Sequence, residues 1–198
     1  MNTQHSHLSH YYEYDPDGNS FAGVGFHGRE IDDERDDGAI VTNLHFDDTP
    51  RAGNWRPLTC HGWSDNPPRI GDFPSVSNYR RVPMMSERAW IALAPLIGGV
   101  CEALPVHHPF SGNYHLVHVL RTIAALDELK SVVARRSPTD QRIYKVYQYS
   151  FRKELIDGLH IFKLPNAQGS ALIVDEEFRR IVENNNLQGL RFQRLPML

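Results

Sequence analysis

The sequence predicts an α+β protein built mainly from antiparallel strands, with a few short helices. Three observations in its last third support this prediction. Residues 143–151 read I-Y-K-V-Y-Q-Y-S-F, an aromatic and β-branched run that is typical of a strand. Asp175 precedes apolar side chains at helical spacing and predicts the N-cap of a helix of about nine residues. Residues 190–195 then return to an extended pattern.

The strand at 143–151 allows two interpretations. A strict alternation places one set of side chains on one face (Ile143, Lys145, Tyr147, Tyr149 and Phe151) and the other set on the opposite face (Tyr144, Val146, Gln148 and Ser150). The aromatics either pack the sheet into the core, or leave tyrosines on the outer face as anchors for a protein partner.

The middle of the chain predicts shorter elements. Ser86 is a candidate N-cap for a helix that Pro95 and the glycines at 98–99 should end early. Strands are expected at 101–106, 114–120 and 159–164, and one or two helical turns at 122–129.

The N-terminal portion predicts a β-rich, loop-rich region. Residues 11–14, 39–46 and 58–63 are strand candidates, and residues 49–74 hold five prolines and three glycines. We expect a single domain, with a variable acidic and proline-rich portion at 1–70 and an α+β core at 71–198.

The bulk composition predicts an ordinary globular protein in a reducing cytoplasm. Of the 198 residues, 40% are hydrophobic and 23% charged, and no apolar run is long enough to cross a membrane. The first ten residues lack the basic flank and apolar stretch of a secretory signal. Cys60 and Cys101 are expected to be free thiols, with a disulfide between them as the alternative.

The net charge of −3 conceals an asymmetry along the chain. Residues 1–50 carry eleven acids and two bases, whereas residues 51–198 carry thirteen acids and nineteen bases. One segment holds most of these acids (Glu30, Asp32, Asp33, Glu34, Asp36 and Asp37). It is either a solvated loop or a surface that attracts a basic protein partner; direct nucleic-acid binding is not expected. Trp55 and Trp63 form either a recognition edge or part of a satellite core.

No pattern in the sequence predicts catalysis or a cofactor. The histidine spacings at 5, 7 and 10 and at 115 and 118 do not match those of a catalytic zinc site. Positions 115 and 118 would also point to opposite faces of a strand. No serine-nucleophile motif is present, and the neighbours Cys60 and His61 do not form an activated pair. The glycines at 23–28 lack the helix that a dinucleotide site requires.

Seven motifs in order give the chain its resemblance to a known family. They are M-S-E-R-A-W-I-A-L (85–93), E-A-L-P-V (102–106), G-N-Y-H-L-V-H-V-L-R-T-I-A-A-L-D-E-L-K-S (112–131), Y-Q-Y-S-F (147–151), G-L-H-I-F-K-L-P (158–165), V-D-E-E-F-R-R-I-V-E (174–183) and L-Q-G-L-R-F (187–192). Over residues 72–198 the chain resembles the immunity protein 11 family of bacterial polymorphic toxin systems. The resemblance implies an intracellular α+β protein without catalytic residues that binds and blocks a cognate toxin. It also implies a shared core (Phe151, Phe162, Phe178, Leu190 and Phe192) and shared turn or pairing positions (Asp127, Lys163 and Gly189).

The leading hypothesis is therefore a cytoplasmic antitoxin that occludes a toxin, with the acidic segment and exposed aromatics as its contact residues. One rival is a small hydrolase or toxin-modifying enzyme that uses His61, His107, His108 or His115 with a carboxylate. The other rival is a homodimeric module built on an edge strand at 190–195.

Overall fold

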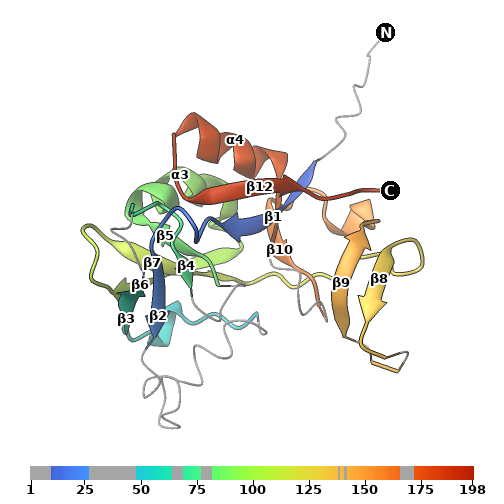
Figure 1. Cartoon of the computed structure of the whole chain (residues 1–198), viewed down its shortest axis with the longest axis horizontal. Coiled ribbons are helices and arrows are strands. Elements are labelled where there is room, and N and C mark those ends of the chain that lie inside the picture. Colours follow the sequence, from blue (N-terminus) through green and yellow to red (C-terminus); the bar gives the residue numbers. More distant parts are fainter. Residues whose placement is uncertain are drawn as a thin grey trace.

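The computed structural model of the chain confirms the α+β class. It describes residues 10–26, 48–63, 69–76, 82–137, 139–140, 142–165 and 172–198. Within these residues, two α-helices lie beside strands that form three sheets (Figure 1). The strand expected at 39–46 lies outside the described residues. No described helix is long and apolar enough to span a membrane.

A four-stranded antiparallel sheet contains both the first and the last strand of the described chain. Its order is β10 (Ile161–Lys163), β11 (Leu172–Asp175), β1 (Tyr11–Pro16) and β12 (Leu190–Arg194). The earliest strand, β1, therefore lies between two strands from the last thirty residues of the chain. The first seventy residues thus contribute an inner strand to this sheet.

Both faces of the four-stranded sheet are buried, and the alternation of side chains explains how. Tyr12 and Tyr14 of β1 enter one buried cluster, whereas Tyr11 enters another. On the neighbouring strand, Val174 joins the first cluster and Ile173 the second. Successive side chains of a strand point to opposite faces, so a run of apolar residues here fills two separate cores.

The second sheet has six strands. Their order is β4 (Ser75–Val76), β2 (Gly23–Phe26), β3 (Leu58–Trp63), β6 (Cys101–His107), β7 (Tyr114–Val119) and β5 (Met84–Ser86). Val117 and Val119 of β7 point into the first cluster, towards the helices. Leu116 points to the other face, where a separate apolar cluster forms.

Helix α3 (Glu87–Ile97) begins as predicted but does not end early. The Ser86 hydroxyl accepts a hydrogen bond from the Ala89 amide at 3.1 Å, which makes it the N-cap. The helix continues through Pro95 and ends only at Ile97. Ala89, Leu93 and Ile97 follow one face and are fully buried. Burying this face offsets the single hydrogen bond that proline removes.

Helix α4 (Glu176–Asn184) confirms its predicted length and cap. The Asp175 carboxylate accepts a hydrogen bond from the Phe178 amide at 3.0 Å. Phe178 and Val182 are buried against the same cluster as α3, and the two helices pack against each other. Of the core positions that the family resemblance implies, Phe151, Phe162 and Phe178 are buried, whereas Leu190 and Phe192 are half-buried.

The predicted helical turns at 122–129 are wrong, because the backbone there pairs with neighbouring strands. The Ile123 amide donates to the Lys163 carbonyl at 2.8 Å, and the Asp127 amide donates to the Ser150 carbonyl at 2.8 Å. Ala125 and Leu126 are buried in the cluster that also receives Tyr11. The apolar residues that resembled a helical pattern instead fill this core in an extended conformation.

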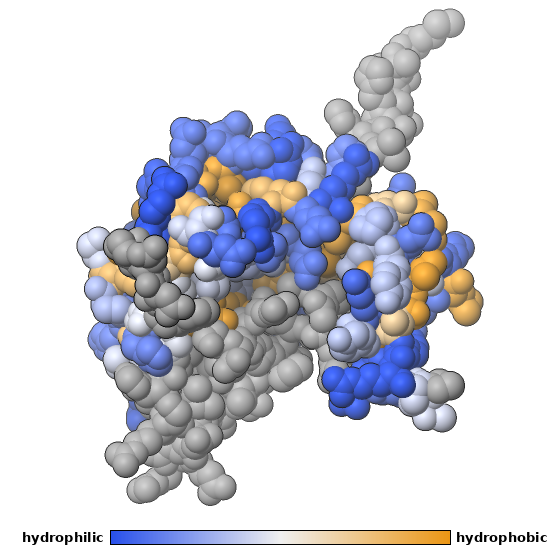
Figure 2. All heavy atoms as spheres, in the orientation of Figure 1, coloured by the Kyte–Doolittle hydropathy of each residue, from blue (hydrophilic) through white to orange (hydrophobic). Residues whose placement is uncertain are grey.

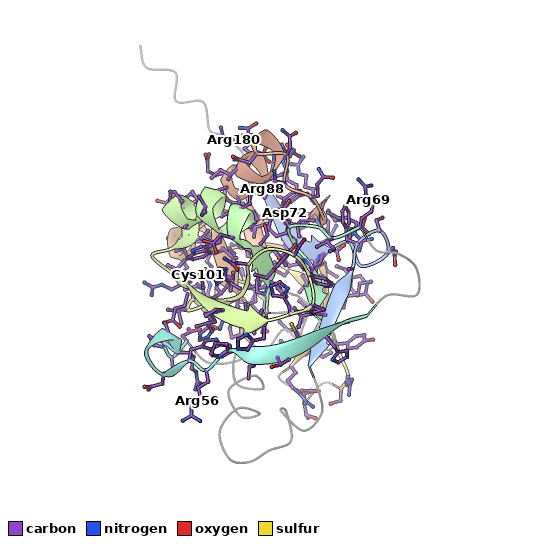
Figure 3. All side chains as sticks on the ribbon, turned by 90° about the vertical axis from the view of Figure 1, so that its left-hand side faces the viewer. Arg56, Arg69, Asp72, Arg88, Cys101 and Arg180 are labelled. Carbon is purple, nitrogen blue, oxygen red and sulfur yellow. The ribbon has the colours of Figure 1, made fainter. Side chains whose placement is uncertain are left out.

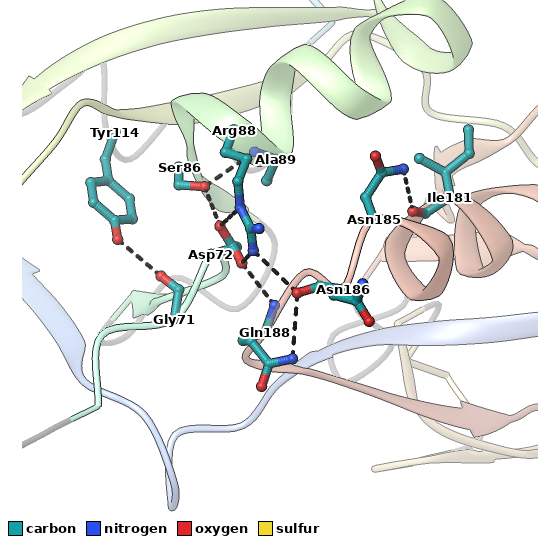
Figure 4. Close-up of polar contacts among 10 residues, drawn as sticks. All are labelled: Gly71, Asp72, Ser86, Arg88, Ala89, Tyr114, Ile181, Asn185, Asn186 and Gln188. Carbon is teal, nitrogen blue, oxygen red and sulfur yellow. Dashed lines mark hydrogen bonds and ion pairs between the residues drawn. The ribbon is translucent and has the colours of Figure 1, made fainter.

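A buried carboxylate connects three distant segments. Asp72 accepts hydrogen bonds from the Ser86 hydroxyl (2.6 Å), the Arg88 guanidinium (2.7 Å) and the Gln188 amide (2.8 Å) (Figure 4). Its own amide donates to the Gln188 carbonyl at 2.7 Å, and Arg88 also donates to the Asn186 carbonyl. We call these four residues (Asp72, Ser86, Arg88 and Gln188) the Asp72 clamp; Figure 3 shows Asp72 beside Arg88. The Asp72 clamp connects the start of α3 to the loop between α4 and β12.

Replacing Asp72 with Asn should destabilise the fold. The substitution removes the charge and turns one acceptor into a donor that faces Arg88, which should lower the free energy of unfolding by about 2–4 kcal/mol. Urea denaturation measures this difference. Asp157→Asn, at an exposed position, is the matched control and should change stability little.

The effect of Asp72→Asn should depend on pH. Burial alone would raise the pKa of Asp72, but hydrogen bonds from Arg88, Ser86 and Gln188 lower it below its usual value. A lowered pKa in the folded state means that the charge stabilises the fold above the unfolded-state value of about 4. The stability difference between wild type and variant should therefore be largest near neutral pH and shrink as the pH falls below about 4. A difference that grows on acidification would contradict this assignment.

Gly71 should not tolerate a side chain. A Cβ at this position would lie 2.8 Å from the Phe21 ring and 2.9 Å from the Gln188 carbonyl oxygen, which the Asp72 clamp holds in place. Gly71→Ala should therefore cost about 1–3 kcal/mol in thermal or urea unfolding. Gly53→Ala is the control, because nothing lies within 4 Å of its Cβ. Equal stability of the two variants would show that the backbone at Gly71 is not tightly held.

Candidate functional site

The partner-binding residues predicted from the sequence are only partly described. The six acids Glu30, Asp32, Asp33, Glu34, Asp36 and Asp37 lie outside the described residues. Trp63 is the last residue of β3, and its side chain is not described. Trp55 is half-buried against the cluster around Leu116, and its indole nitrogen donates to the Pro105 carbonyl at 2.7 Å. Their roles in partner binding stay predictions.

Two of the histidines proposed for the enzymatic rival, His108 and His115, make contacts within the fold. The His108 ring packs edge-on against Tyr114, with 4.8 Å between ring centroids, and its Nδ1 accepts from the Phe110 amide. Burial lowers the pKa of His108, and the nearby His107 and His115 lower it further, against a backbone hydrogen bond that raises it. His115 lies 3.6 Å from the Glu87 carboxylate. Within the described part of the chain, no three His, Cys, Asp or Glu side chains converge as metal ligands.

Both cysteines are buried thiols, and neither forms a disulfide. Burial raises the pKa of the Cys101 thiol to about 12, although the nearby Lys163 charge lowers it in part. Lys163 is itself buried and pairs with the Asp48 carboxylate at 3.0 Å. Cys60 donates through its thiol to the His107 carbonyl. The Cys101 thiol, held neutral by its raised pKa, is a poor nucleophile at physiological pH.

The thiols of the folded protein should therefore resist modification. We expect an Ellman-type disulfide reagent at pH 8 to label neither Cys60 nor Cys101 in the native state, and to label both in concentrated guanidinium chloride. Absorbance of the released thiolate measures the count. Rapid labelling of the native protein would contradict the buried positions of both side chains.

Exposed apolar side chains gather in one segment. In the described residues, eight large apolar side chains are exposed, and five of them lie between residues 129 and 155. These five are Leu129, Val132, Tyr144, Tyr147 and Leu155. The segment contains the two-stranded sheet of β8 (Val132–Arg135) and β9 (Ile143–Gln148), which lies beside the main body at the end opposite β2 and β3 (Figure 1). Figure 2 shows hydrophobic atoms at this end of the molecule, with hydrophilic side chains below them.

The outward tyrosines result from two irregularities in the pairing of β8 with β9. Val132 pairs with Gln148 but Val133 with Val146, which leaves Tyr147 as an extra residue; Tyr144 is extra in the same way. Such β-bulges interrupt the alternation of side chains. The predicted faces of 143–151 are therefore wrong in part: Ile143, Val146 and Tyr149 are buried at every third position, and Tyr144 and Tyr147 are 55% and 52% exposed.

Cations accompany both tyrosines. The Arg136 guanidinium lies over the Tyr144 ring at 5.8 Å from its centroid, and the Lys145 ammonium lies over the Tyr147 ring at 5.0 Å. Such cation–π contacts contribute about 0.5–1 kcal/mol at exposed sites and limit the movement of both side chains. We call Val132, Arg136, Tyr144, Lys145 and Tyr147 the hairpin surface. It combines apolar, aromatic and cationic groups on a short sheet.

The edge strand proposed for a homodimer carries charge. β12 is an edge of the four-stranded sheet, as the sequence predicted, and its side chains Arg191, Gln193 and Arg194 are exposed. Arg191 pairs with Asp15 on the neighbouring strand at 2.7 Å. Charged side chains along an edge oppose the addition of a further strand.

Comparison with protein families gives the geometry its context. Residues 105–196 match the model described as "Immunity protein family (Imm11)". The match confirms the resemblance and covers somewhat less than half of the chain, beginning within β6 and including the hairpin surface, α4 and β12. The first motif of the resemblance, at 85–93, lies before the Imm11 match. A comparison with curated proteins found no match.

The Imm11 match supports an immunity-protein role in general. Sequence reasoning placed the partner-binding residues outside this segment, in the first seventy residues. It did not single out Arg136 or Lys145, and it left Tyr144 and Tyr147 among several aromatics of one strand. The signal that could have found them is the density of bases: residues 129–155 hold seven Lys or Arg and two acids.

Proposed function

We propose that the protein is an immunity protein that acts in the cytoplasm, where it binds a cognate bacterial toxin and neutralises it by occluding the toxin's active site. The match of residues 105–196 to Imm11 is the observation that carries this proposal. An immunity protein of this kind works by forming a stable complex, and its own side chains need to present a complementary surface rather than react.

The described structure is compatible with a binding role. Both faces of the four-stranded sheet are covered by packed side chains, and the Asp72 clamp fixes the loops at its edge. A rigid scaffold of this type loses little conformational entropy when it binds, which favours a tight complex. The exposed tyrosines on β9 provide large contact area at low entropic cost.

Co-expression with the toxin encoded by the adjacent gene tests the proposal. We expect cells that produce the toxin alone to stop growing, and cells that also produce this chain to survive. The affinity-tagged chain should co-purify with the toxin as a one-to-one complex, measured by size-exclusion chromatography with light scattering. Survival without any complex would contradict binding as the mechanism.

The ratio of this protein to the toxin that is needed for protection distinguishes binding from catalysis. A binding immunity protein protects only when its amount at least equals that of the toxin, because each molecule occupies one toxin molecule. Quantitative immunoblotting of both proteins during graded induction measures this ratio. Full protection at a small fraction of the toxin's amount would favour the modifying enzyme over the occluding protein.

A further inference from the structure

We propose that the hairpin surface is where the toxin docks, and that the toxin presents an acidic protein surface to it. This inference rests on the proposed function, which it refines by naming the contact residues and the charge of the partner. It follows from how the two-stranded sheet is anchored, from what its bulges expose and from the charge that surrounds it.

The two-stranded sheet is held firmly by its inner face. Ile143, Val146 and Tyr149 are buried in the cluster that also contains Phe151 and Phe162. The Tyr149 amide donates to the Pro196 carbonyl at 2.8 Å, and the Leu198 amide donates to the Tyr149 carbonyl at 2.9 Å. The C-terminal residues thus pair with Tyr149, the residue that directly follows β9. The opposite face is therefore presented on a fixed support, as a binding surface requires.

The bulges place two aromatic rings outside the buried core. Tyr144 and Tyr147 are the two extra residues of β9, and neither contributes to the buried cluster beneath. β-bulges commonly turn a side chain outward at functional positions. Exposed tyrosines beside a β-branched residue such as Val132, which is 46% exposed, have the composition of the anchors found at protein interfaces.

The charge around these anchors is positive. Residues 129–155 carry seven bases and two acids, in a chain whose net charge is −3. Of the bases, Arg142 pairs with Asp140, Arg135 with Glu128 and Lys130 with Asp127. Arg136 and Lys145 lie over tyrosine rings at the exposed face, and Arg136 also interacts electrostatically with Asp140. A surface of this sign attracts an acidic partner and speeds its association.

The same contacts favour a protein over a nucleic acid as the occupant. Single-stranded nucleic acids bind by stacking bases on open aromatic faces. Each ring here already has a cation over one of its faces. Val132 and the almost fully exposed Leu129 add apolar area, which matches a protein surface better than a phosphate backbone.

Two variants of the full chain test the inference against the toxin encoded by the adjacent gene. The double variant Tyr144→Ala/Tyr147→Ala removes the anchors and should weaken the complex by about 30-fold or more in a direct binding measurement. Lys145→Glu reverses one charge and should slow association by about tenfold at low salt, with a smaller effect at high salt. Urea midpoints near that of the wild type would show that both variants are folded.

Matched controls lie on the helices. Arg180→Glu on α4 makes the same change in net charge at an exposed position, and Ile91→Ala on α3 removes an apolar side chain that is 64% exposed. Both should bind the toxin as the wild type does. If the hairpin variants bind as tightly as the controls while the wild type protects cells, the docking site is wrong and the proposed function stands.

Two further outcomes would contradict the proposed function or the class of partner. A wild-type chain that neither binds the adjacent toxin nor protects against it would remove the proposed function and, with it, this inference. Fluorescently labelled 20-nucleotide DNA and RNA serve as the second probe. If the wild type binds DNA or RNA and the hairpin variants do not, the occupant is a nucleic acid and the proposal of a protein partner is wrong. Wild-type binding to the toxin but to neither nucleic acid, together with the weaker binding expected of the hairpin variants, supports the inference.

Discussion

The buried carboxylate of Asp72 is the constraint on which the arrangement of the two larger sheets depends. Ser86 ends β5 of the six-stranded sheet and caps α3, and Gln188 precedes β12 of the four-stranded sheet; both donate to Asp72. A carboxylate in this position cannot be left without partners, because an unpaired buried charge is costly. The clamp therefore fixes where α3 starts and where the loop after α4 turns. That turn includes Gly189, whose φ of +100° favours glycine.

This scaffold and the hairpin surface have different roles. The sheets and helices enclose a cluster that includes Phe73, beside the clamp, and Phe178 of α4. The two-stranded sheet packs its inner side chains Ile143 and Val146 into the second cluster, on the opposite face of the four-stranded sheet. Its outer side chains Tyr144 and Tyr147 lie outside that cluster and are exposed.

Local signals made part of this structure predictable, and long-range pairing made the rest unpredictable. The N-caps Ser86 and Asp175 act within one helical turn, so sequence patterns identified both helices. The inner position of β1 depends on partners at least 160 residues away, which no local pattern encodes. Strict alternation misplaced Tyr147 because a bulge depends on the partner strand. Asp72 stood in a proline-rich segment without a motif, and its importance follows only from the three segments that converge on it.

Hydrogen–deuterium exchange of the free chain and of the co-purified toxin complex tests the central claim most directly, since it maps the contact surface without any substitution. If the toxin docks on the hairpin surface, backbone amides between residues 129 and 155 should exchange more slowly in the complex. Amides of α3 and α4 should exchange at the same rate in both states. Added protection confined to the two helices, with unchanged exchange in β8 and β9, would contradict the account.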